Sequence, residues 1–165
     1  MGLRFDVGPS GELLAMSIEI QDELDAIRAR MGDTRPLLRA IGAIYYASTM
    51  ARFSSHTNPK GQSWKHLKPD TIHKKKTGMG NRRASIEDPY SQLVWTGTLR
   101  SSLKVNFVGL NAIQIGVNRQ TVPYAAVHQF GHGYVPARPY LGVTKAATEQ
   151  VGKVMEAFIK GQKVD

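Results

Sequence analysis

The chain of 165 residues contains no cysteine. A disulfide framework and a thiolate metal site are therefore excluded, which fits a reducing cytoplasm. No apolar run approaches the roughly 20 residues that a membrane-spanning helix needs. The N-terminal residues also lack the apolar core of a secretory signal. With 41% hydrophobic and 21% charged residues, the composition predicts one globular domain without a membrane partner.

Acidic residues are few: 13 Asp and Glu accompany 22 Lys and Arg, which gives a net charge of +9. The excess is concentrated in a basic segment (residues 60–83), where eight cations stand against Asp70 alone and supply seven of the nine net charges. Three interpretations stay open: a solvated loop, a docking site for an acidic protein, or a nucleic-acid contact. The candidate contact residues are the clustered cations and the nearby aromatics: Lys74, Lys75, Lys76, Arg82, Arg83, Trp64 and Tyr90.

Catalytic and metal-binding motifs are scarce. His128 and His132 have the spacing at which two imidazoles on one helix can share a zinc ion. However, the residues between them include no glutamate base, and Gly131 interrupts the helix that the spacing requires. No serine lies in a nucleophile elbow, and no glycine-rich loop has the ending of a phosphate-binding loop. We therefore expect no enzyme activity, no metal and no cofactor, and interpret both histidines as structural or interface residues.

Hydrophobic periodicity predicts an α+β domain, in which a small antiparallel sheet packs against a long helix and a C-terminal helix. Strands are expected at residues 3–7, 14–20, 104–108 and 113–117, the last two as a hairpin. Helices are expected at residues 21–31, 34–53 and 142–160, with shorter helical turns at 69–76, 99–103 and 124–130. Residues 1–13 are assigned to an N-terminal extension, 14–160 to the domain, 54–92 to an extended basic loop within it, and 161–165 to a flexible tail.

Three side-chain expectations follow from this periodicity. Apolar residues cover one broad face of the long helix, which places Arg39 and Arg52 off that face, while Gly42 and Ala43 permit close packing. In the hairpin, Val105 and Phe107 alternate with Asn106 and form the apolar side of their strand. The apolar side of the C-terminal helix is expected to consist of Ala146, Val151, Val154, Met155 and Phe158.

The most unevenly composed stretch is YAAVHQFGHGYVPARPYL at residues 124–141. It predicts two helical turns ended by Gly131 and Gly133, and then a rigid extended segment over 135–139, because each proline fixes its own φ. Such a segment suits docking between subunits. Arg138 is either a fixed cation for a partner carboxylate or a donor to carbonyls at a helix end of its own fold. The interface candidates in this stretch are Tyr124, His128, Phe130, Pro136, Arg138, Pro139 and Tyr140.

Several short motifs occur in a characteristic order between residues 17 and 158. They are Arg35-Pro36, Ile41-Gly42 and Arg52-Phe53; Pro59-x-Gly61-x-x-Trp64-x-x-Leu67-x-x-x-Thr71; Leu93-x-x-Thr96-Gly97-x-Leu99-x-x-Ser102; Ile115-Gly116; Tyr124-Ala125-x-x-His128-Gln129-Phe130-Gly131; and Pro136-Ala137-Arg138-Pro139-Tyr140-Leu141-Gly142. In this order the chain resembles the phage virion morphogenesis family, the tail completion proteins of tailed bacteriophages and prophages.

The resemblance implies a non-enzymatic structural protein of the phage neck, which finishes the head-proximal end of the tail so that it can join a DNA-filled head. It also implies a homo-oligomeric ring, expected to be a hexamer, that assembles in the host cytoplasm and resides in the virion. The expected partners are further copies of the chain, the tail tube or tail terminator and the head connector. A basic lumen would contact packaged DNA non-specifically. The alternative is a free nucleic-acid-binding protein that uses the basic segment.

Overall fold

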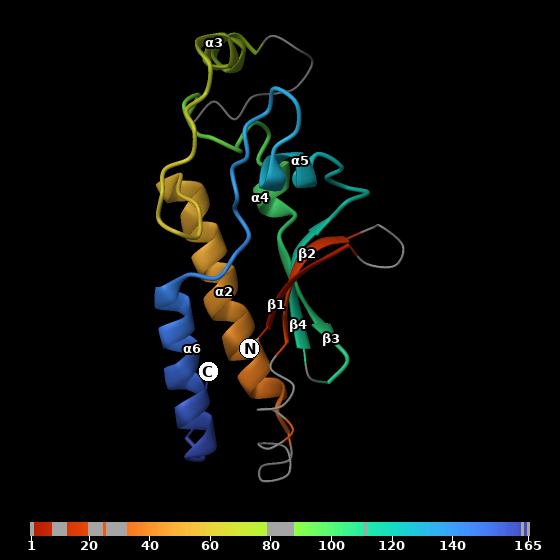
Figure 1. Ribbon diagram of the computed structural model, residues 1–165, viewed down its shortest axis with the longest axis vertical. Helices are drawn as coiled ribbons and strands as arrows, with labels where there is room; N and C mark the ends of the chain where they lie inside the picture. Colours follow the sequence, from red (N-terminus) through yellow and green to blue (C-terminus); the bar gives the residue numbers. More distant parts are fainter. Residues whose placement is uncertain are drawn as a thin grey trace.

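The computed structural model describes residues 2–7, 13–19, 25, 33–78, 88–110, 112–162 and 164 (Figure 1). Its strands are β1 (Gly2–Val7), β2 (Leu13–Glu19), β3 (Lys104–Val108) and β4 (Ala112–Asn118). Its helices are α2 (Arg35–Ser55), α3 (Pro69–Thr77), α4 (Thr98–Ser101), α5 (Ala125–Phe130) and α6 (Lys145–Ile159). The predicted α+β class and its single small antiparallel sheet are confirmed. The helix expected at 21–31 lies outside the described residues, apart from Asp25.

The sheet has the strand order β1-β2-β4-β3, and every neighbouring pair is antiparallel. The expected hairpin is present, with Val105 of β3 opposite Ile115 of β4. On the other side of β4, Met16 of β2 also lies opposite Ile115. Strand β1, which belongs to the part of the chain assigned to an extension, pairs with β2 and forms one edge of the sheet.

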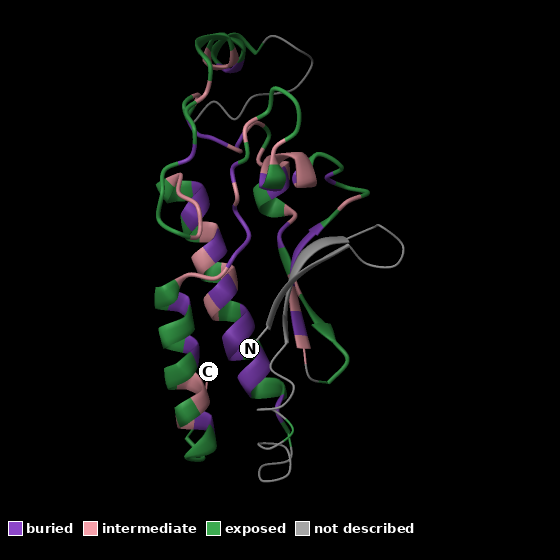
Figure 2. Cartoon of the chain, in the orientation of Figure 1, coloured by how far each residue is buried: buried purple, intermediate pink, exposed green. Residues whose placement is uncertain are grey.

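Helix α2 is the central element, because it lies between the sheet and α6 (Figure 1). Its buried apolar residues lie on more than one side, as a helix with neighbours on two sides requires (Figure 2). On the sheet side, a Cβ atom at Gly42 would lie 2.8 Å from Cγ1 of Val105. The predicted close packing at Gly42 is therefore confirmed, and it brings α2 directly onto β3.

Helix α6 begins later than predicted. Thr144 is its N-cap residue, and the Thr144 hydroxyl accepts a hydrogen bond of 3.1 Å from the Ala147 amide. Ala147, Val151 and Phe158 are buried, whereas Ala146 is exposed. The prediction of Ala146 on the apolar side is wrong, because Ala147 is the alanine that lies one helical turn before Val151 and on the same face.

The outer strand β3 also differs from expectation. Val105 is half-buried beneath α2, but Phe107 is 46% exposed, so the expected apolar side of this strand is only partly covered. Because β3 is an edge strand, its outer flank has no neighbouring strand to cover a large side chain.

Candidate functional site

Helix α5 and the residues after it form a tight corner. Gly131 has φ +78°, and a Cβ atom there would lie 2.9 Å from the backbone nitrogen of Ala137, so only glycine fits. The amides and carbonyls of His132 and Val135 then exchange hydrogen bonds of 3.1 and 2.9 Å. The predicted stop at Gly131 is confirmed, and the exposed turn (residues 131–135) carries Tyr134 at its tip with 96% of its surface accessible.

After this turn, the arm (residues 136–142) leads toward α6 (Figure 1). Its first anchor is the Arg138 amide, which donates a 2.7 Å hydrogen bond to the carbonyl of His128 at the end of α5. Gln129, buried beside it, makes three more hydrogen bonds. Its side-chain oxygen accepts from the amides of Tyr140 and Leu141 at 3.1 and 3.0 Å, and its nitrogen donates to the Leu141 carbonyl at 3.0 Å.

Gln129 of α5 anchors the arm, although it was not among the interface candidates. Its sequence signals are its place in the His128-Gln129-Phe130-Gly131 motif and an amide side chain at the end of a short helix. An amide there can satisfy both donors and acceptors of a neighbouring backbone, as a strand would.

The second anchor of the arm comes from α2. Arg52 is only 3% exposed, and its guanidinium donates to the carbonyls of Tyr140 at 2.6 Å and Gly142 at 2.7 Å. Burial lowers the pKa of Arg52 to about 10. The prediction that Arg52 lies off the buried face is wrong. Arg52 follows the buried Tyr45 and Thr49 at helical spacing, so it lies on the same face of α2. A buried charge needs hydrogen-bond partners, and the backbone carbonyls of the arm supply them.

Aromatic side chains pack beside this anchor. Phe53 lies edge-on to Trp64, with ring centroids 6.1 Å apart, and 5.6 Å from the ring of Tyr140. The Trp64 indole donates to the Pro139 carbonyl at 3.0 Å. Trp64 and Tyr140 are both buried, so these two interface candidates contribute to the core of the protein itself.

Arg138 resolves the choice left open by the sequence. Its guanidinium is buried and donates to the carbonyls of Lys65 at 3.0 Å and His66 at 3.4 Å. The acceptors belong to its own chain, although they lie in the loop before α3 and not at a helix end. Arg138 thus joins the start of the arm to the basic segment.

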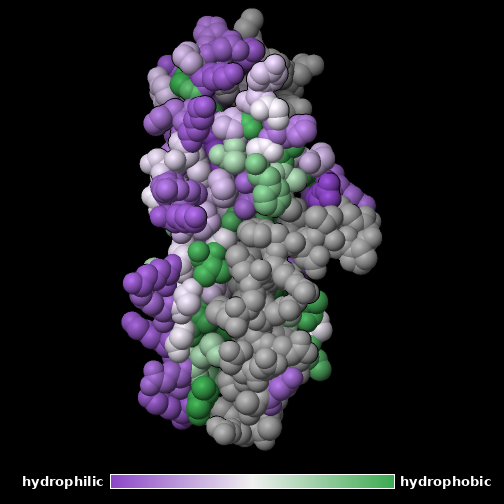
Figure 3. All heavy atoms as spheres, viewed as in Figure 1, coloured by the Kyte–Doolittle hydropathy of each residue, from purple (hydrophilic) through white to green (hydrophobic). Residues whose placement is uncertain are grey.

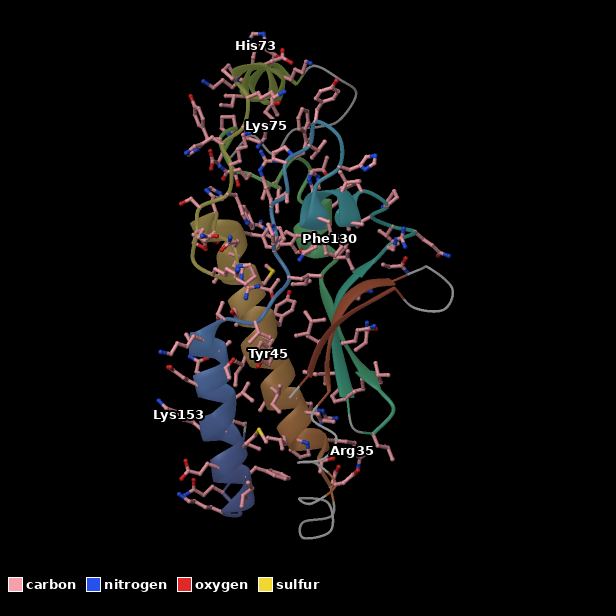
Figure 4. All side chains as sticks on the ribbon, viewed as in Figure 1. Arg35, Tyr45, His73, Lys75, Phe130 and Lys153 are labelled. Carbon is pink, nitrogen blue, oxygen red and sulfur yellow. The ribbon has the colours of Figure 1, made fainter. Side chains whose placement is uncertain are left out.

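The three lysines of the basic segment have different environments. Lys75 is 5% exposed and donates to the Ser91 carbonyl at 2.8 Å, and burial lowers its pKa (Figure 4). Lys74 forms an exposed ion pair with Asp70 at 2.8 Å. Lys76 donates to the hydroxyl of Tyr90 at 2.7 Å and lies 4.8 Å from the centre of its ring. Arg82 and Arg83 lie outside the described residues.

The two histidines of the zinc spacing are separated by the corner. Helix α5 ends at Phe130, so His132 lies beyond it, exposed on the turn. His128 is half-buried, with the ring of Tyr124 5.6 Å away, edge-on. Burial, together with the charge of Arg138, lowers the pKa of His128. Across the described ranges, no three His, Asp or Glu side chains are grouped as a metal site would need.

The remaining candidates differ in accessibility. Phe130 is 56% exposed, and Tyr124 is exposed at the start of α5. Pro136 and Pro139 are partly covered within the arm. The exposed aromatic residues thus lie at the start of α5 (Tyr124), at its end (Phe130) and on the turn after it (Tyr134), whereas Arg138 and Tyr140 are buried.

A comparison with protein-family models matches residues 17–160 to the phage virion morphogenesis family. The chain belongs to this family. The match begins within β2 and ends at the residue after α6, so it includes the corner, the arm and the basic segment. The role that follows is one in the assembly of phage particles.

Two further comparisons found no counterpart. No curated protein and no solved structure gives a significant match to this chain. In the part of the chain that the structure describes, no helix is both long and apolar enough to cross a membrane.

Proposed function

We propose that the protein completes the head-proximal end of a phage tail and joins the tail to the head at the neck, as an oligomeric ring expected to be sixfold. The observation that carries the proposal is the family match over residues 17–160. The role is structural rather than catalytic, and the partners are further copies of the chain, the upper end of the tail and the head connector.

The exposed turn supplies the kind of surface that such assembly requires. Tyr134 stands free at its tip, and Phe130 and Val135 add exposed apolar area at its base. Gly131, the mutual hydrogen bonds of His132 and Val135, and the anchored arm fix this turn to the core. Rigid, exposed aromatic side chains are typical of the residues that contribute most to protein–protein affinity.

Helix α6 is a less suitable interface. On the face shown in Figure 3, hydrophilic side chains gather along α6 and around α3. Lys145 with Glu149 and Lys160 with Glu156 form ion pairs along the exposed side of α6. Such a mixed and solvated charge pattern favours contact with water over contact with another subunit.

The alternative, free nucleic-acid binding by the basic segment, receives less support. Lys75 is buried, Lys74 is paired with Asp70, and Lys76 contacts Tyr90. These three cations are therefore less available for phosphate groups than a solvated loop would make them. A free DNA-binding protein would show log K falling linearly with log salt for the isolated chain. A ring component is expected to show weak binding, or none, before assembly.

The deciding experiment is electron microscopy of a lysate from phage that lacks this protein. We expect full heads beside separate tails whose upper ends are unfinished. Joined particles of normal appearance, or empty unpackaged heads, would contradict the proposed step. Complementation with a Tyr134→Ser variant then tests the exposed turn, with Leu110→Ser, an exposed apolar residue of the β3–β4 loop, as the matched control. Only the Tyr134 variant is expected to fail in joining.

A further inference from the structure

A cleft of about 760 Å³ lies beside the exposed turn. Four segments contribute to its lining: residues 65–75, which include part of α3; residues 91–99, which lead into α4; Tyr124 and His128 at α5; and residues 133–138 of the turn and arm. Its apolar wall consists of Leu67, Leu93, Val94, Trp95, Leu99 and Val135. The basic residues that line it are Lys65, His66, Lys68, Lys75 and Arg138. None of the described residues that line this cleft is acidic.

Two polar atoms in the walls of this cleft lack a partner. The indole nitrogen of Trp95 and Nδ1 of His128 are buried, and neither makes a hydrogen bond within the described structure. Buried polar groups in proteins are nearly always paired. The Trp95 ring lines the cleft, so its indole N–H signal can report on whatever fills it.

Not every cation at the cleft is equally available. The ammonium of Lys75 is bound to the Ser91 carbonyl, and the guanidinium of Arg138 donates to the Lys65 and His66 carbonyls. Lys65 and Lys68 are exposed. Both positive charge and apolar side chains therefore line the cleft.

We propose that this cleft binds an extended segment of a partner protein in which an apolar side chain neighbours a carboxylate. The apolar side chain would lie against Leu93, Leu99 and Val135, beside the ring of Trp95, and the carboxylate would face the exposed Lys65 and Lys68. This inference goes beyond the proposed function, because it requires neither a ring nor a position at the neck.

Charge complementarity favours a partner of this chemistry over the two other possible occupants. A second copy of the chain, with 13 Asp and Glu against 22 Lys and Arg, offers few carboxylates for a basic cleft, whichever other surfaces join the copies in a ring. A nucleic acid would bring a row of phosphates, but the cleft has an apolar wall and only two exposed lysines on its rim. The carboxylates of an acidic, partly apolar protein segment complement the basic residues of the cleft, and its apolar side chains complement the apolar ones.

The two tryptophans allow a direct test with the full-length protein. The indole N–H of Trp64 is buried and bound to the Pro139 carbonyl, whereas that of Trp95 is unpaired at the cleft. In a ¹⁵N–¹H correlation spectrum these give two side-chain signals. The probes are acetylated hexapeptides that alternate leucine or phenylalanine with aspartate. We expect a saturable shift of the Trp95 signal, while the Trp64 signal stays in place as an internal reference.

Control peptides and protein variants test whether binding depends on the carboxylates of the peptide and on the lysines of the cleft. Peptides with asparagine or lysine in place of aspartate are expected to shift the Trp95 signal far less. The Lys65→Glu, Lys68→Glu double variant should weaken binding about tenfold or more, and Lys153→Glu on the distant α6 should leave it unchanged (Figure 4). If neither aspartate peptide shifts Trp95, or if an eight-nucleotide oligo(dT) does so instead, the proposal is overturned.

Discussion

Arg52 of α2 and Gln129 of α5 bind the same short stretch of the arm, residues 140–142, and both contact the backbone of Tyr140. Arg52 donates to the carbonyls of Tyr140 and Gly142, and Gln129 pairs with the amides of Tyr140 and Leu141 and with the Leu141 carbonyl. A buried backbone without a neighbouring strand must find partners elsewhere. Here the side chains of Arg52 and Gln129 supply these partners. Their hydrogen bonds fix the arm and thereby help to fix the exposed turn that precedes it.

Replacing Arg52 with lysine should destabilise the protein. A single ammonium lacks the forked geometry with which the guanidinium reaches the Tyr140 and Gly142 carbonyls, so at least one buried carbonyl would lose its partner. We expect the free energy of unfolding to fall by about 1–3 kcal/mol, measured by urea denaturation. Arg39→Lys, an exposed position on the same helix, is the control and should change it by no more than about 0.5 kcal/mol.

A double-mutant cycle extends this test. Because Arg52 and Gln129 both bind the backbone of Tyr140 and otherwise bind adjacent residues, Arg52→Lys and Gln129→Leu should interact, with the double variant losing less stability than the sum of the single variants. A coupling of about 0.5 kcal/mol or more is expected. Purely additive effects would show that the two side chains hold the arm independently.

Two helical glycines should respond in opposite directions to alanine. At Gly42 the new Cβ would lie 2.8 Å from Val105, so Gly42→Ala is expected to cost about 1–3 kcal/mol through overpacking. At Gly152 of α6 no atom lies within 4 Å of the new Cβ, so Gly152→Ala should stabilise the protein by about 0.5–1 kcal/mol. Thermal unfolding of both variants checks this difference in sign. Adding Val105→Ala should relieve part of the Gly42→Ala defect, and equal stabilisation by both alanines would contradict the close packing of α2 on β3.

Substitutions of the neighbouring residues Lys74 and Lys75 distinguish the effect of lost positive charge from the effect of lost stability. Both Lys74→Met and Lys75→Met remove one positive charge, but only Lys75 is buried and bound to the Ser91 carbonyl. Lys75→Met is therefore expected to cost about 1–3 kcal/mol by leaving buried carbonyl groups unpaired. Lys74→Met should change stability by less than about 1 kcal/mol, because its pair with Asp70 is exposed. If phage titres fall equally with both variants, the charge itself matters. If only Lys75→Met lowers the titres, its effect comes from the loss of folding stability and not from the loss of charge.

His128 should make stability depend on pH. Its pKa is lowered in the folded state by burial and by Arg138, so as pH falls the unfolded chain takes up this proton first. The stabilisation is fully present above the unfolded histidine pKa of about 6.5 and is lost as pH falls from there toward the folded pKa. Urea denaturation at several pH values should show this loss in the natural protein and a smaller loss in His128→Gln. The exposed His132→Gln variant is the matched control, and an unchanged slope in His128→Gln would contradict the assignment.

The elements with strong local patterns could be predicted from the sequence. Helix α2, the β3–β4 hairpin, the helical turns at α3 and α5 and the stop at Gly131 all follow from periodicity, proline or glycine. Side-chain placement was less predictable where a distant segment decides it. Arg52 was placed off the buried face because its acceptors at Tyr140 and Gly142 lie about 90 residues further along the chain.

The basic segment shows the same limit. Its weak periodicity suggests a loop, in which Trp64 is expected to dock on the core, as it does. The burial of Lys75 against the Ser91 carbonyl, in contrast, depends on a contact 16 residues away. The cleft likewise combines four segments that no local motif connects. Local pattern therefore predicted the elements and the corner, whereas the long-range polar contacts required the structure.

The distance in sequence between Arg52 and Gly142 has a consequence for biosynthesis. While the ribosome is still translating the segments between them, α2 has neither the arm nor α6 to cover it, and its arginine stays in water. The strand β2 similarly waits for β4 before it can pair on that side. The domain therefore closes only after its last third has been synthesised, and a chain truncated before the arm would leave the nascent α2 exposed to chaperones and proteases.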